Sequence, residues 1–234
     1  MNKTAYQIFS RVYRYYDLVT HFFSFGFDIK WRKDAAKAAV LLCKKLGYKK
    51  IDVLDLGAGT CDFSIIFAKE ACKNRIKASI YALDFSANML NIARRKAEKS
   101  GVKLHFINGN ALDIPFKDKQ FDLVISGLAV RNFVDTKKFA TESYRVLRNG
   151  GALVVLEMSK PKKHIYKSIY VVYSRLLKPI GMLINKKAYN WLFATMDSFN
   201  PHALCNDIKK AGFSSIYLKY LAFHVAYVII ALKD

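Results

Sequence analysis

The chain has 234 residues, and 53% of them are hydrophobic, which is enough to bury one large core. Its 39 lysines and arginines against 18 aspartates and glutamates give a formal net charge of +21. Such an imbalance favours an anionic partner, either nucleic acid or an acidic membrane surface, and charge alone does not choose between them. The four cysteines have no spacing typical of metal ligands, so we expect reduced thiols in an intracellular protein.

The N-terminus does not have the pattern of a signal peptide, because aromatic residues and arginines interrupt every apolar run within residues 1–17. No uncharged run reaches the roughly 18 residues that a membrane span needs. The longest apolar run, Ile216–Leu232, contains Lys219 and His224 and is interpreted as two strands. We therefore expect a cytoplasmic protein that is soluble or bound at a membrane surface.

From residue 50 onward, short apolar runs alternate with stretches of helical pattern. Strands are predicted over 50–56, 78–83, 104–107, 121–126 and 152–156, and helices over 61–73, 86–99, 135–147 and 201–211. Asn149–Gly151 is predicted as the turn into the fifth strand. The last runs, 215–221 and 225–232, should pair as a hairpin. This order predicts an α/β fold with a mostly parallel, doubly wound, seven-stranded sheet whose terminal strand is antiparallel.

The whole chain, 1–234, is expected to form a single domain with two helical additions. One is an aromatic and basic N-terminal head over 1–50, and the other is an insertion over 158–198, after the fifth strand. From Met158 to Met196 there is no aspartate or glutamate, but there are eight lysines and arginines and six tyrosine, tryptophan and phenylalanine side chains. We interpret head and insertion together as a lid over the active site.

A glycine-containing loop joins the first predicted strand to the next helix, in Val53-Leu-Asp-Leu-Gly-Ala-Gly-Thr60. Gly57 and Gly59 lack a Cβ, so a ligand can approach the backbone closely. The alternative is simply a tight strand-to-helix turn. A dinucleotide fingerprint would place a third glycine at position 62, which is Asp62.

Further polar residues follow the other predicted strands. Asp84 ends the second strand, where an acidic residue binds the hydroxyls of a nucleoside ribose; alternatively it only begins the next helix. The same order of motifs is found in class I, Rossmann-like S-adenosylmethionine (SAM)-dependent methyltransferases, and it predicts SAM as cofactor. The candidate cofactor-binding residues are Asp55, Gly57, Gly59, Thr60, Asp84, Phe85, Asn110, Ala111, Ser126 and Gly127.

A narrower resemblance covers nearly the full chain. The head, with Tyr16-Asp17-Leu18, Ser24-Phe25-Gly26 and Trp31-Arg32, resembles that of the ubiquinone/menaquinone biosynthesis C-methyltransferase family. Arg131-Asn132-Phe133-Val134-Asp135 and Leu156-Glu-Met-Ser-Lys-Pro161 are similar to two further motifs of that family. The chain departs from the family pattern at Val19-Thr20, Asp28, Cys61, Leu112, Gly127, Ala129, Asn149 and His224.

The resemblance implies methylation of a ring carbon of a prenylated quinol, either demethylmenaquinol or a polyprenyl-benzoquinol. Arg131 is the candidate catalytic residue, with Asn132 and Tyr16 in support. Because arginine stays protonated, we expect Arg131 to stabilise the phenolate or to position a water rather than to act as a base. The alternatives are a structural salt bridge for Arg131, for example with Asp17, and a packing pair for Tyr16 and Asp17.

The expected partners are the prenylated quinol and an anionic membrane surface, bound peripherally at its inner face; a homodimer is left open. No metal is expected, because the five histidines are scattered. No nucleic-acid partner is expected either, since the Asn/Asp-Pro-Pro-aromatic motif of base methyltransferases is absent and no two prolines are adjacent. The alternatives are an RNA, DNA or other small-molecule methyltransferase and a non-catalytic quinone-binding subunit with the same fold.

Overall fold

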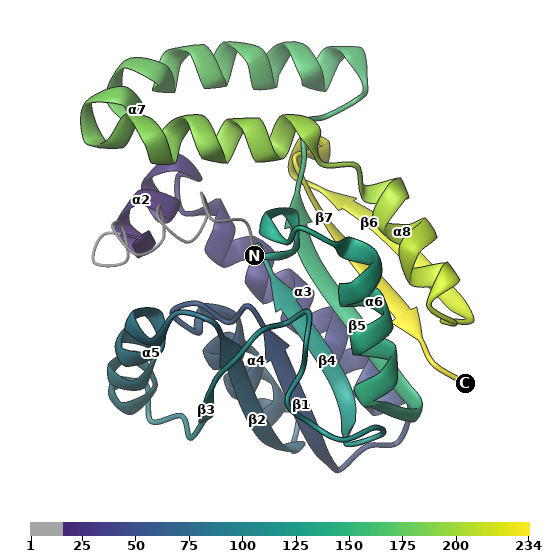
Figure 1. Cartoon of the computed structure of the whole chain (residues 1–234). Coiled ribbons are helices and arrows are strands. Elements are labelled where there is room, and N and C mark those ends of the chain that lie inside the picture. Colours follow the sequence, from purple (N-terminus) through teal and green to yellow (C-terminus); the bar gives the residue numbers. More distant parts are fainter. Residues whose placement is uncertain (1–15) are drawn as a thin grey trace.

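The computed structural model describes residues 16–234, and its centre is a seven-stranded sheet (Figure 1). The strand order is β3-β2-β1-β4-β5-β7-β6, and β7 runs antiparallel to both of its neighbours while the other pairings are parallel. This arrangement confirms the predicted fold class. The strands are β1 (Lys50–Leu56), β2 (Lys77–Asp84), β3 (His105–Asn108), β4 (Phe121–Gly127), β5 (Leu147–Met158), β6 (Ser215–Leu221) and β7 (Ala226–Leu232).

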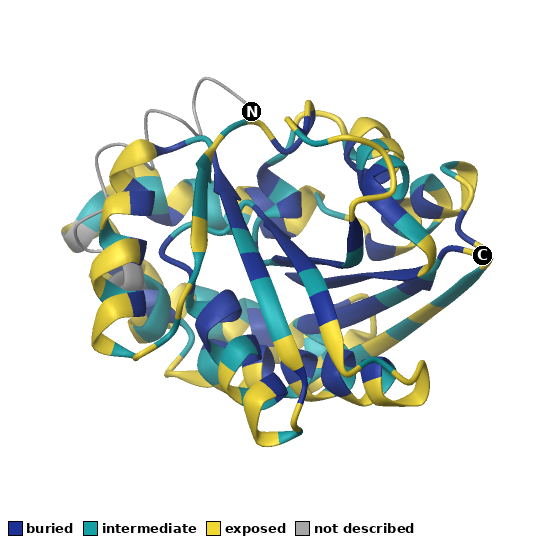
Figure 2. Ribbon diagram, turned by 90° about the horizontal axis from the view of Figure 1, so that it is seen from below, coloured by how far each residue is buried: buried dark blue, intermediate teal, exposed yellow. Residues whose placement is uncertain are grey.

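Helices cover both faces of the sheet and give it three layers. On β1, Ile51 and Val53 pack with α3 and α4, whereas Leu54 and Leu56 belong to the core under α6 and α8. Most residues of the central strands β1, β4, β5 and β7 are buried, as expected when both faces are covered, whereas the edge strands β3 and β6 have only intermediate and exposed residues (Figure 2). The helices are α2 (Tyr16–Phe23), α3 (Phe27–Lys45), α4 (Asp62–Lys73), α5 (Ala87–Lys99), α6 (Thr136–Val146), α7 (His164–Ser198) and α8 (Pro201–Lys210), with short 3-10 helices η2 (Val130–Asn132) and η3 (Ala222–His224).

Side-chain caps define where several helices begin. The Ser86 hydroxyl accepts a hydrogen bond from the Met89 N–H, as predicted, and Asp135 caps α6 in the same way. The turn predicted at Asn149–Gly151 falls inside β5, which begins at Leu147, and Gly150 there is left-handed (φ +77°). Leu147 pairs with Phe121 and Ala152 pairs with Leu123, so the residues between them bulge out of the ladder.

The segment after β5 forms α7, which folds back on itself. Asn185 has non-helical backbone angles (φ −161°, ψ 96°) and separates a first arm, 164–184, from a second arm, 186–198. The Tyr189 hydroxyl donates to the Ser174 carbonyl at 2.6 Å and thereby ties the arms together. Figure 1 shows the first arm as the outermost element, with the second arm between it and the rest of the chain. Within residues 16–234, no helix is long and apolar enough to cross a bilayer.

Candidate active site

A small pocket of about 60 Å³ lies where the carboxyl ends of β1, β2 and β4 meet, and it is named the polar pocket for the charged residues in its lining, Arg32, Asp55, Asp62 and Asp84. Parallel strands bring their carboxyl ends to one edge of the sheet, so the loops that follow them converge there. Its lining includes the predicted residues Asp55, Gly57, Gly59, Thr60, Asp84, Phe85 and Gly127, and also Arg32, Phe63, Met89, Leu128, Ala129, Asn132 and Phe133.

The two loop glycines have different surroundings. Both are left-handed, with φ of +70° at Gly57 and +55° at Gly59. A Cβ on Gly57 would lie 2.7 Å from the Cβ of Ala129, whereas a Cβ on Gly59 would have no neighbour within 4 Å among the described residues. Gly59 therefore presents its backbone to open space. Cys61, where the family pattern has a third glycine, also adopts the left-handed conformation (φ +65°).

Asp84 is attached directly to this loop. One carboxylate oxygen accepts from the Gly59 N–H at 2.8 Å, and the other accepts from the Ser86 N–H at 2.8 Å. Burial nevertheless raises the pKa of Asp84 to about 6. The Asn108 amide donates to the carbonyls of Asp84 and Phe85 and holds the end of β2, a role that the sequence analysis missed.

Asp55 is a fully buried carboxylate behind the glycines. Its Oδ2 accepts from the Ser64 hydroxyl at 2.6 Å, and its Oδ1 accepts no hydrogen bond from residues 16–234. Burial raises the pKa of Asp55 to about 7, although the bond from Ser64 opposes the shift. A nearby positive charge would stabilise the ionised form of this buried carboxylate, because one of its oxygens accepts no hydrogen bond from the described residues.

Three predicted cofactor residues do not line this pocket. Ser126 is buried, and its hydroxyl donates to the Leu56 carbonyl at 2.7 Å, so it joins β4 to β1. Asn110 is exposed, and its Oδ1 accepts from the Leu112 N–H. Ala111 packs into the core on the α6 side of the sheet.

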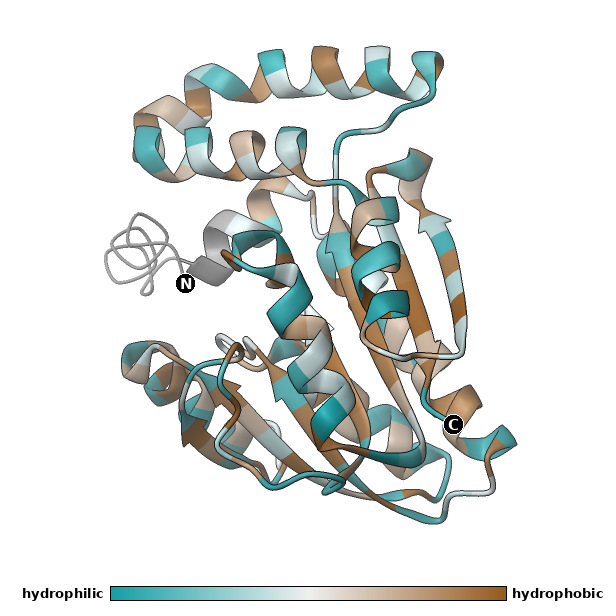
Figure 3. Cartoon of the chain, turned by 45° about the vertical axis from the view of Figure 1, so that its right-hand side comes forward, coloured by the Kyte–Doolittle hydropathy of each residue, from teal (hydrophilic) through white to brown (hydrophobic). Residues whose placement is uncertain are grey.

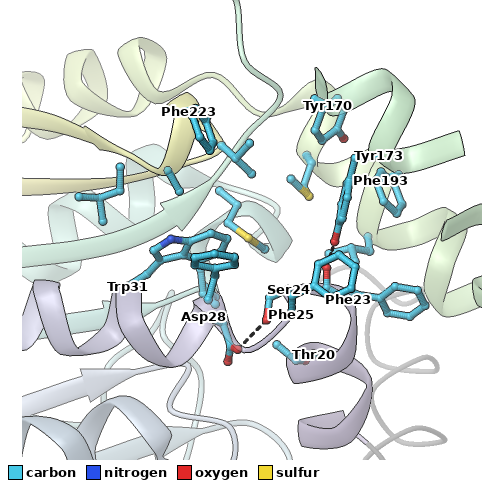
Figure 4. A pocket seen from close by; sticks show the side chains of 18 of the residues that line it. Thr20, Phe23, Ser24, Phe25, Asp28, Trp31, Tyr170, Tyr173, Phe193 and Phe223 are labelled. Atoms are coloured by element: carbon cyan, nitrogen blue, oxygen red, sulfur yellow. Dashed lines mark hydrogen bonds between the residues drawn. The ribbon is translucent and has the colours of Figure 1, made fainter. Parts of the chain in front are cut away.

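A second, larger cavity of about 420 Å³ adjoins the polar pocket and is mostly apolar. Figure 4 shows Trp31 and Asp28 from α3 on one side and Tyr170, Tyr173 and Phe193 from α7 on the other. Further lining comes from η2, the end of β5 and the turn around η3, with Arg131, Met158 and Phe223 among the residues. The insertion and the described part of the head thus meet over the carboxyl edge of the sheet.

A buried carboxylate lies at the base of this cavity. Asp28 is fully buried and accepts hydrogen bonds from Ser24 (2.6 Å), His21 (2.8 Å) and Arg32. Burial raises the pKa of Asp28, but the bond from Ser24 and the charge of Arg32 outweigh it, so the pKa lies below its usual value. Arg32 also lines the polar pocket, so this cluster connects the two cavities.

Arg131 projects into the apolar cavity from η2, and its guanidinium is fixed by an acid. Its Nη1 lies 2.5 Å from Oε1 of Glu157 and donates to the Leu128 carbonyl at 2.9 Å. The side chains are 7% and 0% exposed, so this is a buried pair. Glu157 is thus a salt-bridge partner of Arg131, whereas the side chain of Asp17, the partner considered from sequence, lies outside the described part of the chain. The sequence carried a signal for Glu157, an acid at the end of the apolar run of β5.

One short wall separates the two cavities. Leu128 and Asn132 line both of them, and Arg131 lies between these two residues in sequence. The Trp191 indole N–H of α7 donates to Asn132 Oδ1 at 3.0 Å and orients the amide. Tyr16, the third predicted catalytic residue, begins α2, but its side chain lies outside the described part of the chain. The two cavities are therefore adjacent, with Leu128 and Asn132 between them.

Solved structures with this fold include SAM-dependent methyltransferases. The chain matches one from Thermotoga maritima with a TM-score of 0.59 at 19% identity, covering 95% of this chain and 98% of that one. It matches another from Aquifex aeolicus with a TM-score of 0.56 at 19% identity, covering 83% and 88%. The chain therefore has the fold of these methyltransferases.

The sequence comparisons narrow the class. The model of the ubiE/COQ5 methyltransferase family matches residues 1–233, and the chain belongs to that family. It is 39% identical to the demethylmenaquinone methyltransferase of Thermus thermophilus over 223 residues, covering 94% of this chain and 96% of that protein. The demethylmenaquinone methyltransferase of Geobacillus sp. is 34% identical, with 95% and 93% covered. The family predicted from sequence is confirmed.

Proposed function

We propose that the enzyme methylates a ring carbon of demethylmenaquinol, with SAM bound in the polar pocket and the prenylated quinol in the apolar cavity. The observation that carries this proposal is the shared wall of Leu128 and Asn132 between the two cavities. Methyl transfer needs donor and acceptor in line about 3–3.5 Å apart, and the adjacency of the two cavities supports such an arrangement. The relatives named above act on demethylmenaquinone, which favours the naphthoquinol over a benzoquinol.

The polar pocket has the groups that SAM requires. The carboxylate of Asp84 would accept hydrogen bonds from the ribose hydroxyls of SAM. The open space beside the Gly59 backbone would let the cofactor approach the loop closely. SAM carries a positively charged sulfonium group, and the buried carboxylate of Asp55 with its unpartnered Oδ1 is suited to a cationic ligand. When bound, SAM supplies an electrophilic methyl group, and the protein's task is to activate and orient the quinol.

Arg131 is the group we assign to that task. The quinol becomes a carbon nucleophile as its phenolic proton passes to water, and the guanidinium stabilises the negative charge that develops on the oxygen. The ring proton that the methyl group replaces also passes to water. Glu157 and the Leu128 carbonyl hold Arg131 in place, so little reorganisation is needed during the reaction. Asn132, oriented by Trp191, and Tyr16 are the supporting polar residues.

The long apolar tail of the substrate requires contact with a membrane, and we place the enzyme peripherally at the inner, cytoplasmic face. The acid-free segment Met158–Met196 offers positive charge for an anionic surface. Lys160 is an exception within it, because it pairs with Asp197 at 3.3 Å. The exposed basic residues that remain are Lys162, Lys163, Lys167, Arg175, Lys178, Lys186 and Lys187.

The test is methyl transfer from labelled SAM to short-chain demethylmenaquinol and to the benzoquinol analogue. In Arg131→Ala we expect the methylation rate to fall much further than SAM affinity, because the interaction is made in the transition state. Arg131→Lys keeps the buried charge and serves as the control for folding. Equal losses of rate and SAM affinity in a folded variant would make Arg131 structural and would contradict the proposed mechanism.

A further inference from the structure

Large exposed apolar side chains are concentrated around the apolar cavity. Three lie at the corner between α2 and α3, and one lies in η3. The largest group lies on the first arm of α7: Ile165, Ile169, Val172, Leu176, Ile180, Met182 and Leu183. By contrast, lysines and arginines are spread along the whole sequence. The exposed apolar side chains are therefore concentrated in one region of the molecule, whereas the basic residues are not.

Six of these residues form a stripe. Ile165, Ile169, Val172, Leu176, Ile180 and Leu183 follow each other at spacings of three or four, which places them on one face of the helix. Leu176 is 71% exposed and Leu183 is 89% exposed. Figure 3 shows hydrophobic turns along this outermost arm. The helix has a separate buried face, with Tyr170 and Leu177, so the stripe is not the side that holds α7 to the protein.

The stripe continues into the rim of the cavity. Ile169 belongs to the stripe and also lines the cavity. Phe25, Phe27 and Phe223 line the cavity as well, and each is more than half exposed. Ile169 therefore joins the stripe to the lining of the cavity assigned to the quinol.

We infer that the stripe inserts among the acyl chains of an anionic lipid monolayer, with the cavity rim facing the lipid. This inference rests on the proposed function, because the prenyl tail would pass from lipid to cavity without crossing water. Lys167, Arg175 and Lys178 on the same arm are exposed and reach the headgroups while the stripe enters below them. Charge attracts the enzyme to the surface, and apolar contact holds it there.

The alternative occupant is a second copy of the chain. A two-fold dimer would place one stripe against the other. It would then bring together two segments that contain no acid and carry eight lysines and arginines each between Met158 and Met196. Such a contact opposes like charges, whereas anionic headgroups complement them. Charge therefore favours the lipid.

The experiment is flotation with vesicles of phosphatidylglycerol and phosphatidylcholine at 0.1 M and 1 M NaCl. The variant is Leu176→Gln with Leu183→Gln, which removes apolar surface without changing charge. Its matched control is Leu41→Gln with Leu46→Gln, two exposed leucines away from the stripe. We expect the wild type and the control to keep part of their binding at 1 M NaCl. The stripe variant should lose this salt-resistant part, by at least about tenfold in partition coefficient.

Activity separates this inference from the proposed function. The stripe variant should methylate a water-soluble short-chain quinol at the wild-type rate but fail with a long-chain quinol in vesicles. Wild-type binding that 1 M NaCl abolishes, or a stripe variant that still binds at 1 M NaCl, would overturn the inference. A change from dimer to monomer in light scattering with vesicle binding unchanged would assign the stripe to a second copy. No turnover of the short-chain quinol by the wild type would instead contradict the proposed function.

Discussion

The polar pocket and the apolar cavity share a wall but are built from different kinds of contact. The polar pocket, about 60 Å³, is formed mainly by loops that directly follow β1, β2 and β4, and backbone N–H groups hold its key carboxylate. The cavity, about 420 Å³, is lined by side chains from Thr20 to Val225 that only packing brings together. Local backbone geometry thus determines the polar pocket, and long-range packing determines the apolar cavity.

The largest effect on stability is expected beside the shared wall, from substitution of Glu157. Glu157→Ala leaves the buried Arg131 guanidinium without its carboxylate, and breaking such a pair costs about 3–5 kcal/mol of unfolding free energy. Glu157→Gln keeps an acceptor for the Met158 N–H and should cost less. Urea denaturation measures both. An unchanged unfolding free energy in Glu157→Ala would show that the wall does not depend on this pair.

Alanine at the two loop glycines should separate fold from cofactor binding. In Gly57→Ala the new Cβ meets Ala129 in a left-handed backbone, which should destabilise the protein by about 2–4 kcal/mol. Gly59→Ala has room for its Cβ and should cost about 1–2 kcal/mol of stability while weakening SAM binding. Thermal denaturation and calorimetry measure the two quantities. Equal SAM affinity in Gly59→Ala and the wild type would remove Gly59 from the cofactor site.

Substitution of Asp84 and a change of pH should both weaken SAM binding in the polar pocket. Asp84→Asn should lose about 1.5–3 kcal/mol of SAM binding, the scale of a charged hydrogen bond, while the quinol cavity is unaffected. Because burial raises the pKa of Asp84 to about 6, SAM affinity should fall by up to about tenfold per pH unit below that value. The stability of the ligand-free protein should change with pH in the opposite direction from SAM affinity. Because the pKa of Asp84 is raised in the folded state, Asp84 contributes stability at low pH, and this contribution is lost as pH rises through about 6.

Calorimetry between pH 5 and 8 checks this dependence, with Asp84→Asn as the control. The variant should lack the affinity change near pH 6. If the change persists in Asp84→Asn, the titrating group is a different one, and Asp55, whose pKa burial raises to about 7, is the next candidate.

The smallest effect is expected from Trp191→Phe, which removes the hydrogen bond to Asn132 and keeps an aromatic ring. The loss should be about 0.5–1.5 kcal/mol in kcat/KM for the quinol, with SAM affinity unchanged. Steady-state kinetics with both substrates varied provides the measurement. A parallel loss of SAM affinity would mean that Asn132 serves the cofactor side of the wall more than the substrate side.

The sequence by itself determined the sheet, the family and seven of the residues that line the polar pocket. Alternating apolar runs give the strands, and the motif around Gly57 and Gly59 lies within one strand-to-helix connection, so its geometry follows from local order. Asp84 was found for the same reason, because it ends a strand beside that loop. Asn110, Ala111 and Ser126 were named from the same kind of order, but they do not line the pocket.

Only the tertiary structure decided which residues come together at the apolar cavity. Arg131 and Glu157 are 26 residues apart, and Trp191 and Asn132 are 59 apart, so no local pattern pairs them. The sequence located the acid-free insertion, but not which of its residues face outward. The fold of α7 into two arms turns Tyr170 and Leu177 inward, exposes Leu176 and Leu183, and pairs Lys160 with Asp197. Burial depends on what each face of a helix meets, and that is settled by packing between distant segments.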